Sequence, residues 1–144
     1  MKHKYVLTLD DAKQIAAAAE AEAIRNDWNV AIAIVDDGGH LIVFHRIDDT
    51  QYGSCEIAIL KARTAISLKR QSKDVADAVA EGKTGMLSIP GIIPLEGGLP
   101  LIVKTEGREQ YVGAIGVSGV KSNEDGIVAK AGADFFANIA MSNN

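Results

Sequence analysis

Two glycine-rich segments, residues 94–100 and 113–119, hold several side chains and amides suited to contact a ligand. The candidate binding residues within them are Glu96, Gly97, Gly98 and Ser118. Adjacent glycines leave backbone N–H groups uncovered, so the pair at 97–98 could bind an oxyanion. Glycine inside a strand equally marks a bulge or a close approach of two backbones. The two segments therefore predict either one wall of a ligand site or tight packing at a sheet edge or subunit contact.

Charged side chains elsewhere in the chain could complete a site for a small anion. Arg46 can hold a carboxylate through two parallel hydrogen bonds, and Lys61 can add a point charge. Lys61 falls on an alanine-rich face of an expected helix, although an ion pair with a carboxylate would explain it equally well. The carboxylates available for that pair are Asp36, Glu56 and Asp125. Such a site would accept porphyrin propionates, corrinoid amides or phosphates, or small organic acids.

The chain has few residues that could ligate iron or start a reaction. His45, at the end of an expected strand and on the opposite face from Arg46, is the better histidine candidate for haem iron; the alternative is a hydrogen-bonded structural histidine. His40 follows a turn, and Cys55 has no histidine next to it in the sequence. Asp36 ends a strand at a turn, which suits either a proton acceptor or an ordinary turn residue. No spacing typical of a metal site, a dinucleotide site or a nucleophile elbow is present.

Length and composition restrict the class of protein. A chain of 144 residues fits one domain, which we place at residues 1–144. Its formal net charge of -4 argues against a nucleic-acid partner. No apolar run approaches the roughly 20 residues needed to cross a bilayer, and no signal peptide is evident. The single cysteine excludes an internal disulfide. We therefore expect a cytoplasmic protein with no membrane partner.

The first third of the chain predicts one helix and one hairpin. Thr8 is a good N-cap for a helix over residues 9–26, with acidic residues in its first turn. The helical spacing of apolar residues predicts a buried face made of Ala12, Ile15, Ala16, Ala19 and Ala23. Strands at residues 30–35 and 40–46 flank a turn at residues 37–39. Both strands are apolar on both faces, so we expect this hairpin to be central and covered on each side.

The rest of the chain predicts three helices and a second hairpin. Ser54 could cap a helix over residues 55–69, whose expected core positions are Ile57, Leu60, Ala65 and Leu68. A short helix follows from Ser72 to near Gly82, then an irregular segment over residues 85–98. Strands at residues 101–105 and 110–118 precede a last helix that begins near Ser122. The order α-β-β-α-α-β-β-α, with tight turns between strands, predicts an α+β fold.

These segments resemble the GlcG/HbpS family, which includes the C-terminal domain of PduO-type proteins. The matching positions are residues 7–12, residues 31–36 with Gly39, Arg46 with Asp48, residues 61–65, residues 94–100, residues 113–119, and Asp125 with Ala129. The resemblance implies a profilin-like fold, with an antiparallel sheet of about five strands flanked by helices and assembled into homo-oligomers. It also implies haem or related tetrapyrrole binding, which is a property of some members. Relatives of the PduO type act beside cobalamin-dependent diol metabolism.

One departure from the family bears on haem. In some relatives a histidine on the first helix ligates iron, but residues 9–26 of this chain contain no histidine. We expect an oligomeric protein that binds a small ligand, haem or a corrinoid, as an accessory to cobalamin-linked or redox metabolism. The first alternative is a cofactor-free enzyme on a small organic acid, with Arg46 and Lys61 for the anion and Asp36 as proton acceptor. The second is a structural partner of a metabolic enzyme.

Overall fold

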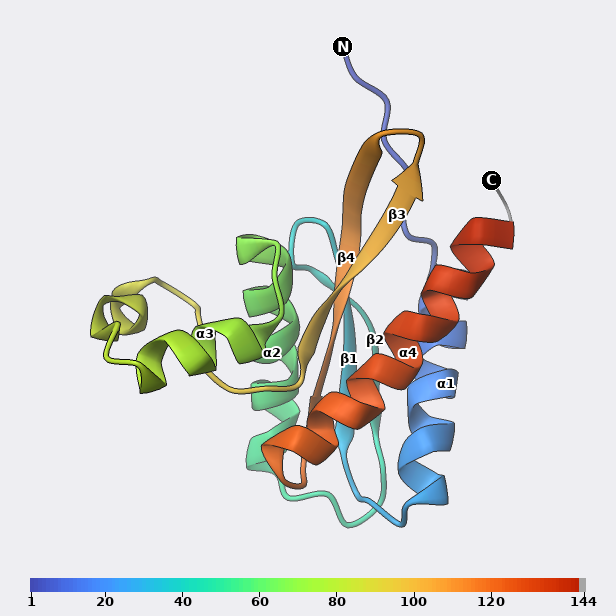
Figure 1. Cartoon of the computed structure of the whole chain (residues 1–144). Helices are drawn as coiled ribbons and strands as arrows, with labels where there is room; N and C mark the ends of the chain where they lie inside the picture. Colours follow the sequence, from blue (N-terminus) through green and yellow to red (C-terminus); the bar gives the residue numbers. More distant parts are fainter. Residues whose placement is uncertain (143–144) are drawn as a thin grey trace.

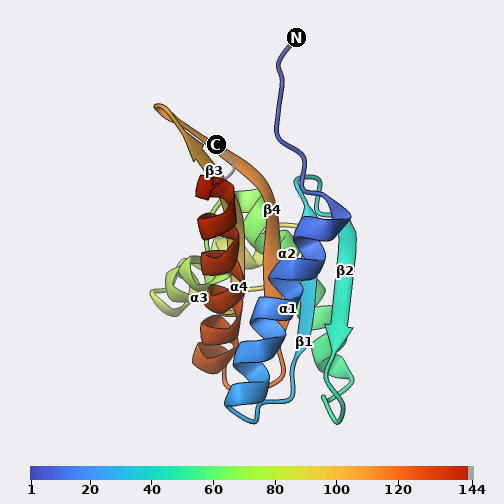
Figure 2. The ribbon, with the colours of Figure 1, turned by 90° about the vertical axis from the view of Figure 1, so that its right-hand side faces the viewer.

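An antiparallel four-stranded sheet runs through the centre of the protein (Figures 1 and 2). The computed structural model describes residues 1–142. The strands are β1 (Ala31–Asp36), β2 (Leu41–Arg46), β3 (Gly98–Thr105) and β4 (Arg108–Ser118), in the spatial order β2-β1-β4-β3. The α+β class is confirmed. The expectation of about five strands is wrong, because four occur within the described residues; a profilin-like topology stays a prediction.

Helices α1 (Leu9–Arg25) and α4 (Ser122–Ser142) lie side by side on one face of the sheet (Figure 2). Thr8 and Asp11 form a reciprocal capping box at the start of α1, so the predicted N-cap is confirmed. All five apolar residues predicted for its inner face are buried. They pack with Ile32, Ile34 and Ile115 of the sheet into the main hydrophobic core. Small alanine side chains let this helix approach the strands closely.

Helix α2 (Gly53–Leu68) covers the opposite face, and α3 (Ser72–Ala80) and a short 3-10 helix (Thr84–Ser88) project beside it (Figure 1). Two expectations for α2 are wrong. Ser54 is not its cap, because the helix begins one residue earlier and Ser54 is buried inside it. Of the four expected core residues only Ala65 is fully buried. The face against the sheet consists of Ser54, Ala58, Lys61, Ala62, Thr64, Ala65 and Ile66.

The first hairpin is central in only one of its strands. Every apolar residue of β1 is buried, because β2 and β4 pair with its two edges. Strand β2 is partly exposed along its length and forms an edge of the sheet. The expectation of a hairpin covered throughout is therefore wrong for β2. An apolar strand at an open edge offers unpaired backbone groups to another chain.

Glycines in β4 explain the small residues on α2. A Cβ added to Gly116 would lie 2.0 Å from the Ala58 carbonyl oxygen and 2.6 Å from the Ala62 nitrogen. We expect Gly116→Ala to push α2 away from the sheet and to lower the free energy of unfolding by about 1–3 kcal/mol or more. Gly85→Ala is the matched control, since nothing lies within 4 Å of the added Cβ. Urea denaturation of the two variants checks this, and equal midpoints would contradict it.

Candidate functional site

Lys61 and Asp125 form a buried ion pair between α2 and α4. The Lys61 Nζ lies 3.0 Å from the Asp125 Oδ2 and donates a 2.9 Å hydrogen bond to the carbonyl of Val117. The two side chains are only 2% and 3% exposed. The other Asp125 oxygen accepts the backbone N–H of Val120 at 3.1 Å. Of the three carboxylates considered for Lys61, the structure pairs it with this one, and the charge of Lys61 is balanced inside the protein.

Burial also alters the acidity of Asp125. Removal from water raises the pKa of this carboxyl, and the neighbouring Lys61 ammonium opposes that rise without cancelling it. A raised pKa means that the charged form of Asp125 is held at a cost in the folded protein. Because Lys61 of α2 contacts both Asp125 of α4 and the Val117 carbonyl of β4, the pair links these three elements.

Gly97 and Gly98 pack directly over Lys61. A Cβ on Gly97, whose φ is +132°, would lie 3.0 Å from the Lys61 Nζ, and one on Gly98 would lie 2.2 Å from the Lys61 carbonyl oxygen. The N–H of Gly98 donates to the Ser72 Oγ at 2.8 Å, so this amide is already used. Ser118 is also buried, at the end of β4. The close approach of backbones expected as one alternative for the glycine segments is what these contacts show.

Asp36 closes the turn between β1 and β2. Its Oδ1 accepts the backbone N–H groups of Gly38 and His40, both at 2.9 Å. Partial burial acts to raise the pKa of Asp36, but these two amides and the charge of His40 together hold it below its usual value. A carboxylate with a lowered pKa is a weak proton acceptor at neutral pH. These contacts are those of a turn residue.

The structure does not bring Asp36, Arg46 and Lys61 together. Arg46 pairs with Ala31 at the start of β1, five residues from Asp36, which separates their backbones by roughly 16 Å. The Arg46 guanidinium lies 5.8 Å from the centre of the Tyr52 ring. Lys61 is enclosed between α2 and α4. An enzyme that uses all three groups on one substrate has no common cavity here.

His45 lies against α1 beside Glu20. The register pairs His45 with Ile32, so both side chains point to the face that α1 covers. The His45 Nδ1 is 3.1 Å from the Glu20 Oε1, and the side chains are 33% and 39% exposed. Nδ1 is buried and has no aligned hydrogen bond among the described residues, so its contact with the Glu20 carboxylate is one of proximity. The exposed part of the side chain lies away from Nδ1.

This pairing has a chemical consequence for the imidazole. A carboxylate beside Nδ1 favours the proton on that nitrogen and leaves Nε2 as a free electron-pair donor. Ile24, one helical turn beyond Glu20, exposes 62% of its surface and adds an apolar side chain to the same stretch of α1. The sequence did not indicate Glu20, because strand alternation assigns His45 to one face of the sheet but does not identify the helical residue that lies against it.

A groove of about 600 Å³ between β3, α4 and the start of α3 includes three of the predicted binding residues. Glu96, Gly97 and Gly98 line it, so these three lie together; Arg46, Lys61 and Ser118 are not part of its lining. Lys73, Lys104 and Lys130 stand at its rim with Asp134. The groove is therefore open and charged, with an apolar floor that includes Ile102.

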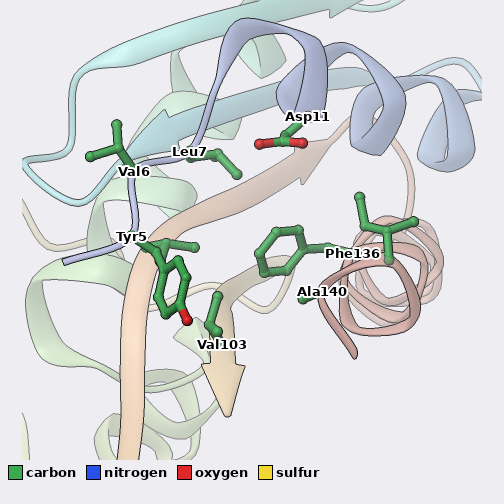
Figure 3. A pocket seen from close by; sticks show the side chains of 9 residues that line it. Tyr5, Val6, Leu7, Asp11, Val103, Phe136 and Ala140 are labelled. Atoms are coloured by element: carbon green, nitrogen blue, oxygen red, sulfur yellow. The ribbon is translucent and has the colours of Figure 1, made fainter. Parts of the chain in front are cut away.

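A second pocket, of about 160 Å³, lies where the N-terminal arm crosses the ends of β3 and α4 (Figure 3). Its walls are hydrocarbon from Leu7, Val103 and Phe136, and Asp11 points toward it. The Asp11 carboxylate already accepts the Thr8 N–H as part of the capping box. At this pocket the N-terminal arm packs on the hydrophobic core.

Residues 1–142 contain neither a cluster of metal ligands nor a membrane-spanning helix. Within residues 1–142, no three histidine, cysteine or acidic side chains gather as they would around a metal ion. None of the helices in that part of the chain combines the length and the apolar character required to span a membrane.

Comparison with known proteins gives one matching family model and several similar proteins. The family model described as "haem degrading protein HbpS-like" matches residues 7–134. Protein GlcG of Escherichia coli is 42% identical over 118 residues, which is 82% of this chain and 85% of GlcG. The structure of a double mutant of HbpS from Streptomyces reticuli has a TM-score of 0.81 at 33% identity, covering 94% of this chain and 90% of that one. A PduOC–haem complex has a TM-score of 0.77 at 26% identity, covering 90% and 94%.

Proposed function

Because this chain belongs to the HbpS-like family, we propose that it is an oligomeric tetrapyrrole-binding protein in which His45 ligates haem iron. The observation that carries the proposal is the pairing of His45 with Glu20 on the face of α1. Histidines that ligate metals usually have a carboxylate or carbonyl partner on their other ring nitrogen. The haem complex of a structural relative supports haem as the ligand.

The residues around His45 fit a haem. Nε2 would face the iron, Glu20 would fix the ring, and the exposed side chain of Ile24 would contact the macrocycle. When bound, haem supplies an iron centre that exchanges electrons and axial ligands. A corrinoid would instead present a cobalt ion, which imidazole can also ligate. The lone cysteine suits a reducing cytoplasm, and we propose that the protein acts there. Its role would be that of an accessory to cobalamin-linked or redox metabolism.

The His45 site is open in a single chain. Its two polar side chains are about one-third exposed, and β2 is an edge strand. A porphyrin bound there would keep one face in water unless another surface covered it. We propose that a second copy of this chain supplies that surface, so that the protein forms a homo-oligomer in which Ile24 is covered.

A haemin titration followed by absorption tests the proposed function. We expect a shifted Soret band that saturates at a fixed ratio of haem to protomer, and light scattering should show an oligomer. A parallel titration with hydroxocobalamin distinguishes a corrinoid protein from a haem protein. A featureless, non-saturating response to both compounds would overturn tetrapyrrole binding.

A further inference from the structure

The Glu96 carboxylate lies in the groove without a direct partner. It is half-buried, and within residues 1–142 it makes no hydrogen bond and no ion pair. Glu96 does act on Lys73 through its charge: the hydrogen bond from Lys73 to Asp77 raises the pKa of that lysine, and the Glu96 charge adds to the rise. The two oxygens of Glu96 are not among the buried, unpartnered polar atoms of the described residues, so they reach the solvent of the groove. Both oxygens are therefore available to accept a hydrogen bond from a ligand in the groove.

Gly126 of α4 makes the space for this carboxylate. A Cβ at Gly126 would lie 2.6 Å from the Glu96 Oε2 and 3.2 Å from its Cδ and Cγ, and all three nearest atoms belong to Glu96. Glycine in the interior of a helix is less stable than alanine. Gly126 is thus an unfavourable residue for the helix, and it stands where a larger residue would displace the Glu96 side chain from the surface of α4.

Three ammonium groups surround the same groove. Lys73, Lys104 and Lys130 pair with Asp77, Glu109 and Asp134 at 2.8, 3.7 and 2.6 Å. All six side chains are about half exposed or more. Such surface pairs are weak, so the ammonium groups can turn toward an anion that enters. The lining then offers three cations against the carboxylates of Glu96 and Asp134.

We propose that this groove binds a small carboxylate that also carries a hydroxyl group. The lysines hold the carboxylate, Glu96 accepts the hydroxyl proton as a hydrogen bond, and the apolar floor contacts the carbon chain. A hydroxyl suits Glu96 better than an ammonium group does, because a cationic ligand would be repelled by the three lysines. Strands β2 and β3 are the opposite edges of the sheet, roughly 14 Å apart, so this site is separate from His45.

Calorimetric titration with L-malate and succinate tests the proposal, since the two differ by one hydroxyl. We expect wild-type protein to bind malate at least about tenfold more tightly than succinate, the effect of one hydrogen bond to a charged group. Glu96→Ala should bring the two affinities together, because only malate loses a hydrogen bond while both acids are relieved of repulsion by the Glu96 charge. Absence of malate binding, or equal affinities for the two acids in the wild type, would overturn the proposal.

Gly126→Ala separates the placement of Glu96 from its chemistry. Alanine should strengthen the helix while its Cβ displaces the carboxylate, so we expect preference for malate to fall to near one with the fold intact. Gly53→Ala, in a helix with nothing within 4 Å of the new Cβ, is the control and should keep the preference. A Gly126→Ala protein that still binds malate tenfold more tightly than succinate would contradict the role of Gly126 in placing Glu96. Neither result depends on haem binding.

Discussion

Replacing Lys61 with methionine is expected to lower the free energy of unfolding by about 3–5 kcal/mol, the usual loss when one partner of a buried ion pair is removed. Methionine fills a similar volume but leaves Asp125 buried without its countercharge. The Val117 carbonyl also loses the donor that reaches it at 2.9 Å. Urea denaturation at neutral pH measures the change.

The double variant K61M/D125L tests whether charge, rather than packing, causes that loss. An apolar replacement of both partners is often neutral or stabilising, so we expect the double variant to recover most of the stability. Losses that simply add would show that packing dominates. Lys104→Met, which disrupts an exposed pair, is the matched control and should change stability by less than about 1 kcal/mol.

The pH dependence of Lys61→Met gives a second readout. Burial raises the pKa of Asp125, and the variant lacks the lysine that opposes this rise. A carboxyl with a higher pKa in the folded than in the unfolded state binds its proton more tightly when folded, so stability increases as pH falls through that interval. The deficit of the variant should therefore shrink on acidification from neutral pH toward the raised pKa. A deficit that is constant with pH would contradict an ionised Asp125.

Replacing Glu20 with glutamine is expected to weaken haem binding by about 10–100-fold, the effect seen when the carboxylate behind a metal-ligating histidine is lost. Glutamine preserves the size of the side chain but removes the charge beside the His45 Nδ1. Both side chains are partly exposed, so the fold should be little affected. Haemin titrations give the affinities, and thermal unfolding serves as the check on the fold. An affinity equal to that of the wild type would remove Glu20 from the site.

Helix α1 could be predicted almost completely from the sequence, because a local period and a local cap determine it. Thr8 and Asp11 are three residues apart, and the alanine positions repeat at helical spacing. The buried face of α2 could not be predicted in the same way. Large apolar residues such as Leu60 suggested one face, but Gly116 of β4 brings the helix so close that only small residues fit at Ala58 and Ala62. That constraint comes from a strand far away in the chain.

The same distinction holds for the candidate site: positions set by the local sequence could be predicted, and contacts between distant segments could not. The separation of Asp36 from Arg46 could have been predicted, since one flanks the hairpin turn and the other ends the return strand. The partner of Lys61 could be reduced to three carboxylates but not to Asp125, which is 64 positions away. Glu20 and Gly126 gave no signal, because their contacts with His45 and Glu96 depend on how helices settle on the sheet.

The Soret spectrum of His45→Ala protein, compared with wild-type and His40→Ala proteins under one haemin titration, tests the central claim most directly. His40 is the natural control, because it belongs to the same hairpin but is 83% exposed beside the turn. We predict that wild-type and His40→Ala proteins show the same histidine-ligated spectrum, and that His45→Ala loses it. An unchanged spectrum in the His45→Ala protein would contradict the account.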